Sequence, residues 1–272
     1  MAVLQPLAVV GAGRLGSAIV AALRAAGVPA SGPHGRGYRG VGDAVVLLCV
    51  PDDAIRVAAA SVVPGPLLGH CSGASGLDVL GEREGFSLHP LMTVTAEGAD
   101  FTGVPAAVAG STDRSLAAAQ ALGEALGLLP VRVAEADRVA YHAAASFAAN
   151  FLITVESAAA QLMSTAGLDR DVLLPLARAA LENWGRTGPS ALTGPVARGD
   201  QRTVARHRDA VRARAPELLE LIDALVGATG RLARANETAR NPVAAEPVGS
   251  AEPGTTSTEP IGADLTQEPN RP

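Results

Sequence analysis

Residues 7–16 read LAVVGAGRLG, an apolar β-branched run followed at once by Gly11, Gly13 and Gly16. This GxGxxG spacing lies between a strand-like run and an Ala-rich helical stretch, a context typical of dinucleotide-binding turns. Gly11 would permit the tight turn, Gly13 a close approach to a pyrophosphate, and Gly16 the packing of helix on strand. A purely structural glycine turn is the alternative. We predict a cofactor-binding turn made of Gly11, Ala12, Gly13, Arg14, Leu15 and Gly16.

The choice between NAD and NADP depends on the segment after this helix. NAD sites usually place a carboxylate about 20 residues beyond the glycines, but no acidic residue occurs before Asp43. The segment SGPHGRGYRG instead carries His34 and Arg36, and arginine can bind a 2′-phosphate bidentately. Arg36 and Arg39 of this segment could also simply face water. The segment is also short and Gly-rich for a second Rossmann strand. The sequence favours NADP(H).

The rest of residues 1–133 alternates short apolar runs with Ala-rich stretches, which predicts a parallel sheet covered by helices on both faces. The fold class expected is α/β, a doubly wound Rossmann domain followed by an all-α domain. The expected strands are 3–10, 44–50, 67–70, 86–88, 104–109 and 129–133. The expected helices are 14–26, 53–61, 76–82 and 112–126.

Residues 134–235 read as helices only, beginning with one long apolar helix over 138–166. Residues 236–272 are rich in Pro, Glu, Thr, Ser and Gly, a composition that predicts a disordered tail. We therefore expect three parts: an NADP-binding domain (1–133), a helical domain for substrate binding or dimerisation (134–235) and the tail.

Bulk composition limits the possible partners and compartments. The net charge of −5 and the lack of a basic cluster argue against nucleic acid. Two cysteines without CxxC spacing fit a reducing cytoplasm, and no His/Cys/Asp/Glu set has metal-ligand spacing. The N-terminus reads as a strand rather than a signal peptide. No apolar run approaches the roughly 20 residues needed to cross a bilayer, so no membrane association is expected.

Several strand ends should open onto one edge of the sheet, because ligands of such sheets lie beyond the carboxyl ends of the strands. Val50 and Pro51 follow the second long apolar strand and should line the nicotinamide or ribose pocket. Ser72 and His89 follow the next two strands and could bind a carboxylate or carbonyl of a substrate. His70 reads equally well as a structural residue.

A polar stripe marks the long helix, since His142, Ser146 and Asn150 are spaced four residues apart and should share a face. Their catalytic reading has His142 donating a proton to the substrate while Ser146 and Asn150 orient it; a hydrogen-bond ladder between helices is the alternative. Arg198 could clamp a substrate carboxylate or merely pair with Asp200. Trp184, the single tryptophan, reads as a core residue.

In this order, GAGRLG, CVPDDAI, HCSG, LHPLMT, YHAAASFAANFL and ALTGPVARGD resemble a bacterial family that pairs a Rossmann-like domain with "domain of unknown function 2520" (DUF2520). The resemblance covers residues 5–230. The family is similar in layout to ketopantoate reductases, pyrroline-5-carboxylate reductases and β-hydroxyacid dehydrogenases, whose helical domain is like that of 6-phosphogluconate dehydrogenase. This implies a dinucleotide on the first domain and a homodimer formed through the second.

Ketopantoate reductases and β-hydroxyacid dehydrogenases use a Lys and an Asn four residues apart on the interdomain helix. Asn150 matches the Asn, but Ser146 stands at the Lys position and the chain has no lysine at all; His142 is the proposed substitute. The leading expectation is an NADP(H)-dependent oxidoreductase that reduces a small, ketopantoate-like 2-oxo acid. The alternatives are an imine reductase of the pyrroline-5-carboxylate type and a non-catalytic NADPH-binding regulatory module.

Overall fold

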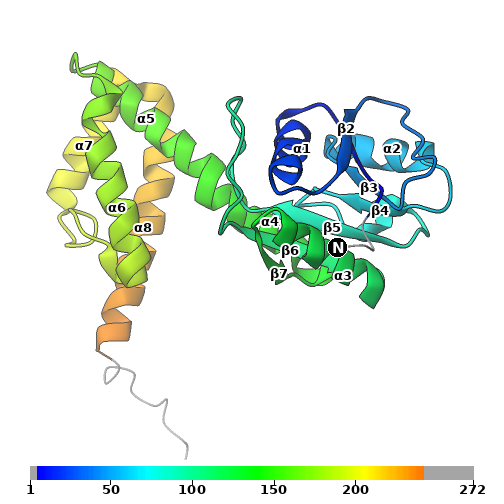
Figure 1. Cartoon of the computed structure of the whole chain (residues 1–272). Helices are drawn as coiled ribbons and strands as arrows, with labels where there is room; N and C mark the ends of the chain where they lie inside the picture. The colour runs from blue at the N-terminus through cyan, green and yellow to red at the C-terminus, as the bar shows by residue number, and fades with distance from the viewer. Residues whose placement is uncertain (1–4, 242–272) are drawn as a thin grey trace, which may run out of the picture. The chain divides into compact units, whose positions relative to one another are not determined.

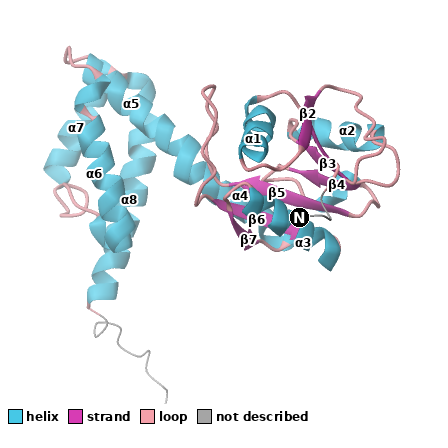
Figure 2. Cartoon of the chain, in the orientation of Figure 1, coloured by secondary structure: helices cyan, strands magenta, loops and turns pink. Residues whose placement is uncertain are grey.

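The computed structural model describes residues 5–241. A seven-stranded sheet in the order β2-β1-β3-β4-β5-β6-β7 forms its first part (Figures 1 and 2). Six strands match the apolar runs of the sequence, whereas β2 has the weak strand sequence ASGPH. The strands are β1 (Leu7–Val10), β2 (Ala30–His34), β3 (Val45–Leu48), β4 (Leu67–His70), β5 (Gly85–Pro90), β6 (Pro105–Gly110) and β7 (Leu129–Arg132).

The sheet is mixed, because β5 and β6 run antiparallel while every other neighbouring pair is parallel. Phe86 pairs with Gly110, and Pro90 pairs with Ala106. The expectation of a wholly parallel sheet was therefore wrong at this pair. The physical reason is the connection: residues 91–104 hold no helix, and a parallel return needs a crossover of a dozen or more residues, usually helical.

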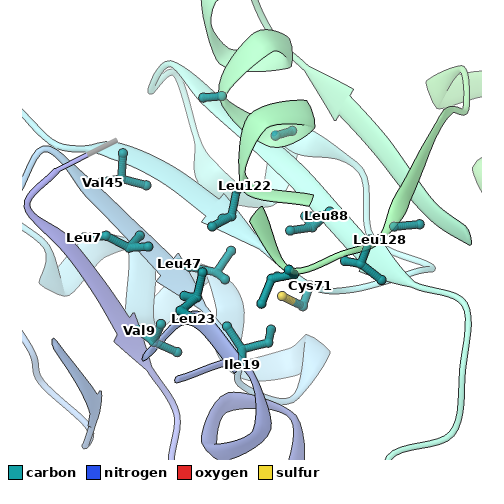
Figure 3. Close-up of a cluster of buried hydrophobic side chains, with 14 of the residues drawn as sticks. Leu7, Val9, Ile19, Leu23, Val45, Leu47, Cys71, Leu88, Leu122 and Leu128 are labelled. Atoms are coloured by element: carbon teal, nitrogen blue, oxygen red, sulfur yellow. The ribbon is translucent and has the colours of Figure 1, made fainter. Parts of the chain in front are cut away.

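Helices cover the sheet on both faces, as the doubly wound prediction requires. The side chains of β1 alternate: Leu7 and Val9 belong to a core cluster that includes α1 and α3 (Figure 3), whereas Ala8 and Val10 belong to one with α2 and η3. These helices are α1 (Arg14–Ala25), α2 (Ile55–Ser61), α3 (Asp113–Ala125) and the 3₁₀ helix η3 (Leu77–Leu80).

Local capping explains where α3 begins. Thr112 Oγ1 accepts the Ser115 backbone N–H at 3.1 Å, and Ser115 Oγ accepts the Thr112 N–H at 2.9 Å, a reciprocal capping box.

The expected helix over 76–82 is instead the short η3, and the one expected over 53–61 begins with the 3₁₀ turn η2 (Asp52–Ala54). The start of a helix thus matches its sequence signal best where a cap or turn is strong.

The long helix after β7 is continuous but not uniform. After the 3₁₀ turn η4 (Glu135–Asp137) it runs as α4 (Arg138–Ser146), a π-helix η5 (Phe147–Phe151) and α5 (Leu152–Ser164). Single π turns inside α-helices are rare and often mark functional sites. The wider i→i+5 turn falls between Ser146 and the end of the polar stripe, so the α-helical spacing that placed Asn150 on one face with His142 does not hold there.

Among residues 5–241, the stretch Glu135–Ser164 is long and apolar enough to cross a membrane by length and composition alone. This corrects the expectation that no apolar run comes near that length. None of its most apolar window is buried, and Phe147 and Ile153 are 70% and 63% exposed. Within the described residues, the helix therefore has an exposed apolar surface.

Two compact units divide between Ala158 and Ala159, so most of the long helix belongs with the sheet. The second unit holds the end of α5 and α6 (Leu174–Thr187), α7 (Gln201–Arg214) and α8 (Leu219–Arg240), with the 3₁₀ turns η6 (Arg170–Val172), η7 (Gly188–Ala191) and η8 (Pro216–Leu218). Because α8 reaches Arg240, the tail expected from 236 was placed too early; residues 242–272 lie outside the described part.

Candidate functional site

The glycine turn joins β1 to α1, and steric contacts require two of its three glycines. Gly11 has φ of +113°, and a Cβ there would lie 2.2 Å from the Cys49 carbonyl oxygen. A Cβ on Gly16 would lie 2.0 Å from the Gly11 oxygen. The Gly11 N–H donates to the His34 carbonyl at 2.8 Å, which ties the turn to the end of β2. The fold itself explains Gly11 and Gly16.

Gly13 is different, because the fold does not need a glycine there. Its backbone is extended, with φ −76° and ψ 180°, and a Cβ would meet no atom within 4 Å. Ala12, Gly13 and Arg14 are exposed, and the first turn of α1 has no acidic residue. The space in front of Gly13 is open. Together with the unpaired amides of a helix N-terminus, it suits a phosphate group.

The loop after β2 is organised by stacked rings. The rings of His34 and Tyr38 stack with centroids 3.9 Å apart, and the Tyr38 hydroxyl donates to Asp43 at 2.7 Å. His34 Nε2 and the Ser31 hydroxyl share a hydrogen bond of 2.8 Å. One face of the His34 ring is therefore covered by Tyr38, and its Nε2 is hydrogen-bonded to Ser31. Arg36, in contrast, is exposed and forms no ion pair within residues 5–241. Arg36 is the more available of the two predicted ligands for a 2′-phosphate.

The carboxyl ends of β1, β3, β4 and β5 lie at one edge of the sheet, because these four strands are parallel. Val50 and Pro51 follow β3, Ser72 follows β4, and His89 lies near the end of β5. Val50 is half-buried and Pro51 is exposed. The glycine turn, the expected pocket residues Val50 and Pro51, and two of the three expected substrate residues, Ser72 and His89, therefore share this edge.

Ser72 is built into the turn that leaves β4. It is 6% exposed, and its Oγ accepts the backbone N–H groups of Ala74 at 3.2 Å and Ser75 at 2.8 Å. The Ser72 N–H donates to Nδ1 of His70, which is fully buried. Only the hydroxyl hydrogen of Ser72 is left to donate to a ligand, so the structure shows a mainly structural role for this side chain.

Three polar rings meet beside Gly73. His89 Nδ1 and the Tyr141 hydroxyl share a hydrogen bond of 2.9 Å, and the rings of His89 and His142 meet edge to face with centroids 6.2 Å apart. A Cβ on Gly73 would lie 2.7 Å from His89 Cε1 and 2.8 Å from His142 Cδ2. Both imidazoles can pack this closely because position 73 has no side chain. His89, Tyr141 and His142 are each half-buried, and we call them the ring cluster.

Arg138 lies in the interior at the start of α4 with 1% of its surface exposed. Its guanidinium donates to Ser87 Oγ at 2.6 Å, to Glu135 Oε1 at 3.0 Å and to the Ser72 carbonyl at 3.4 Å. Ser87 lies on β5 and Ser72 just after β4, so one side chain fixes the helix to two strand ends. Tyr141 and His142 stand three and four residues further along α4, and Arg138 therefore sets their position over the sheet edge.

Burial and the Arg138 charge keep two histidines neutral. Desolvation, His142 and Arg138 lower the pKa of His89 from 6.5 to about 4, against the opposing charge of Asp52. Desolvation and Arg138 also lower the pKa of His70 to about 4. Since Nδ1 of His70 accepts a backbone N–H, its proton sits on Nε2, which has no hydrogen-bond partner within the described residues. Burial raises the pKa of Tyr141, and Arg138 opposes that rise.

The remaining predicted residues do not join this cluster through their side chains. Ser146 Oγ donates to the His142 carbonyl at 3.2 Å, a hydrogen bond to the backbone of its own helix one turn earlier. Asn150 is exposed within the π-helix. Arg198 is exposed in the second unit, and its expected partner Asp200 instead caps α7 by accepting the Thr203 N–H. The expected core residue Trp184 is 61% exposed.

Two residues of the site, Tyr141 of the ring cluster and Arg138 beneath it, had no role assigned from the sequence. Tyr141 stands beside His142 in the motif, but its partner His89 is 52 residues away. Arg138 looks like an ordinary polar helix start, and only the neighbouring serines of β4 and β5 reveal its burial. A serine within the buried apolar strand GFSLHP was the available signal, because a buried hydroxyl needs a partner.

Comparison with known proteins places this geometry in context. Residues 104–229 match the family model "Domain of unknown function (DUF2520)". No match to the chain was found among curated proteins. Among solved structures, a Bacteroides fragilis protein provisionally described as an NADP oxidoreductase is 20% identical, with a TM-score of 0.72 over 83% of this chain and 97% of that one.

Two further solved structures are similar. Protein TM1727 from Thermotoga maritima is 23% identical, with a TM-score of 0.67 over 85% of this chain and 99% of that one. A reductive aminase from Aspergillus terreus, in complex with NADPH and ethyl levulinate, is 14% identical, with a TM-score of 0.63 over 84% and 93%. At these identities the likeness shows a shared fold.

Proposed function

We propose that this chain is an NADP(H)-dependent oxidoreductase that reduces a small, ketopantoate-like 2-oxo acid. The observation that carries the proposal is the open space at Gly13, where a glycine that the fold does not require stands at a helix N-terminus. A residue without a steric reason in the protein itself is explained by a ligand whose pyrophosphate approaches the backbone there.

The phosphorylated dinucleotide is favoured by the charges around the loop after β2. Arg36 and Arg39 are exposed, and no carboxylate precedes Asp43, whose Oδ2 accepts the Tyr38 hydroxyl. A 2′-phosphate would find two guanidinium groups and little negative charge nearby. NADPH, when bound, would supply a hydride, and this chain's own residues must then orient the substrate and provide a proton.

The ring cluster is the proton source that the geometry supports. It stands at the sheet edge that also carries the glycine turn, and it contains His142, the donor expected from the sequence, with an imidazole free of hydrogen-bond partners within residues 5–241. Ser146 and Asn150 remain the proposed orienting residues and Arg198 the proposed carboxylate clamp. The chain has no lysine, so its acids are limited to groups of this kind.

Cofactor choice is tested by titrating the protein with NADPH and with NADH. We expect NADPH to bind far more tightly, and Arg36→Ala to weaken NADPH binding about 10- to 100-fold, the loss of a charge-assisted contact, with NADH unchanged. Arg56→Ala, which removes an exposed arginine from α2, is the matched control. Tighter binding of NADH by the unaltered chain would overturn the proposal.

Catalysis is tested by following NADPH oxidation with pyruvate, ketopantoate and other 2-oxo acids, and with cyclic imines. Turnover of the oxo acids supports the proposal. Turnover of imines alone would favour the imine reductase, since hydride addition to a protonated imine needs no separate proton donor to oxygen. Tight NADPH binding without any turnover would favour a regulatory module.

We further propose that the second unit is completed by a second copy of the chain. From Ala159 to residue 241 only Val211 and Ala215 are buried, so these helices have almost no core of their own. Large apolar side chains remain exposed: Val172, Leu174, Leu176, Leu181, Trp184, Leu225 and Leu232. Symmetric pairing of two identical faces is the commonest way to cover such a surface.

The mass of the particle in detergent-free solution tests this pairing. We expect twice the chain mass of 27.3 kDa, and we expect Leu176→Arg on the exposed face of α6 to give monomers or insoluble protein. A protein that sediments with lipid vesicles, and is monomeric once detergent extracts it, would instead assign the apolar surface of Glu135–Ser164 to a membrane.

A further inference from the structure

We propose that Tyr141 delivers the proton to the reduced substrate and that His89 reprotonates Tyr141 from water. The inference rests on the proposed reductase function and assigns the proton donor within that site. The juxtaposition that carries it is the 2.9 Å hydrogen bond between the Tyr141 hydroxyl and His89 Nδ1, at the edge of the sheet where β5 ends.

Tyr141 is better placed than His142, the other candidate donor, to be reprotonated after it gives up its proton. The His142 ring contacts His89 edge to face and has no hydrogen-bond partner within residues 5–241, so nothing holds its orientation or returns a proton to it. The Tyr141 hydroxyl has such a partner. The ring of His89 is perpendicular to that of Tyr141, with centroids 5.7 Å apart, which points a ring nitrogen at the hydroxyl.

The proton transfer balances without any further reagent. As hydride reaches the carbonyl carbon, the π pair moves to oxygen, the Tyr141 O–H bond breaks and a new O–H bond forms on the substrate. The Nδ1–H of His89 then passes to the phenolate oxygen while a proton from water binds Nε2. His89 begins and ends neutral, with its proton moved from one nitrogen to the other, and exchange with water restores the first tautomer.

The surroundings of His89 suit a neutral relay. Its Nε2 edge faces Gly73, where a Cβ would lie only 2.8 Å away, and His142 stands on the same side. The charged and titratable groups that act on the ring are His142, Arg138 and Asp52. The cationic Arg138 lies buried beneath the helix that carries Tyr141, where it disfavours an imidazolium and stabilises a transient phenolate.

The kinetic test compares Tyr141→Phe, His89→Asn and His142→Ala in NADPH oxidation with the 2-oxo acid that the unaltered chain reduces. We expect Tyr141→Phe to lower kcat about 100-fold, the size of a general-acid effect. Asparagine can keep a hydrogen bond to Tyr141 through an amide but cannot relay a proton, so His89→Asn should lower kcat about tenfold with KM unchanged. His142→Ala should have the smallest effect of the three.

Substrate-independent controls accompany these assays. NADPH binding should be the same in all three variants, and histidine NMR signals of the full chain should show a neutral His89 at pH 7. Full turnover by Tyr141→Phe would overturn the relay while leaving the reductase function intact. An imidazolium at His89 at neutral pH would overturn it whatever the kinetics. NADPH binding without turnover by the unaltered chain would overturn relay and function together.

Discussion

Arg138 and Ser87 meet through a 2.6 Å hydrogen bond in the interior, where the first residue of α4 reaches the middle of β5. Both side chains are essentially inaccessible to water. The same guanidinium binds Glu135, whose side chain is 45% exposed, so the buried positive charge is paired with a carboxylate that water still reaches. The ring cluster is held by Arg138 and its half-exposed partner Glu135, one helical turn away.

Arg138→Met should destabilise the chain by about 3 kcal/mol, because the guanidinium no longer bridges β4, β5 and α4 and Ser87 loses its buried partner. Chemical denaturation of the intact protein measures this loss. Arg56→Met is the control: the Arg56–Asp78 pair is exposed at both ends and should contribute less than about 1 kcal/mol. Equal, small effects of the two substitutions would show that the buried network does not stabilise the fold.

Gly13→Ala should leave stability within about 1 kcal/mol of the unaltered chain, since only a helix N-cap preference is lost. It should nevertheless weaken NADPH binding about tenfold or more, because the new methyl group occupies the approach of the pyrophosphate. Gly11→Ala separates the two effects: its Cβ would clash with the Cys49 carbonyl and must destabilise the fold itself. Unchanged NADPH affinity in Gly13→Ala would remove the main support for the cofactor site.

The glycine turn was predictable because its signals are local. The strand, the turn and the helix start of residues 7–16 are all specified by adjacent residues, and the structure reproduces them. The antiparallel β5–β6 pair was not predictable in this way, because strand direction depends on the connection rather than on the apolar run. The π turn at Phe147–Phe151 has no signal in hydrophobic spacing either, and it displaces the stripe that the sequence suggested.

Acid should destabilise the fold through His70. The unfolded chain binds a proton on this ring below pH 6.5, whereas the folded chain binds it only below about 4, because burial and Arg138 lower the pKa. Stability is therefore highest above pH 6.5, falls as the pH drops through this window, and has lost roughly 3 kcal/mol from this group below pH 4. Denaturation curves at several pH values measure the slope.

His70→Asn should roughly halve that slope, because asparagine keeps an acceptor for the Ser72 N–H but does not titrate, whereas His89, whose pKa is also lowered to about 4, still does. His207→Asn, on the exposed face of α7, is the matched control and should retain the slope of the unaltered chain. If His70→Asn keeps the full pH dependence, His70 does not carry the penalty that its burial implies.

Residues that act across the fold were the hardest part of the site to predict. His89 lies on β5 and Tyr141 on α4, and the two side chains meet only because α4 packs over the edge of the sheet. Arg138 begins a helix with alternating polar and apolar neighbours, so a position on the surface was the simpler expectation. Sequence reasoning placed His89 and His142 in the site by residue type, whereas their contact over Gly73 depends on tertiary packing.

Trp184 provides a direct optical test of self-association. It is the chain's one tryptophan, and 61% of it is exposed on α6, among other exposed apolar side chains. If a second copy covers this face, Trp184 is buried at high protein concentration, and its fluorescence should shift to shorter wavelength as the protein is concentrated through the dimer equilibrium. Leu176→Arg should abolish the shift, whereas Arg178→Ala, on the same helix, should leave it in place. Emission typical of a water-exposed indole at every concentration, in a particle of single-chain mass, would show that α6 is not the covered face.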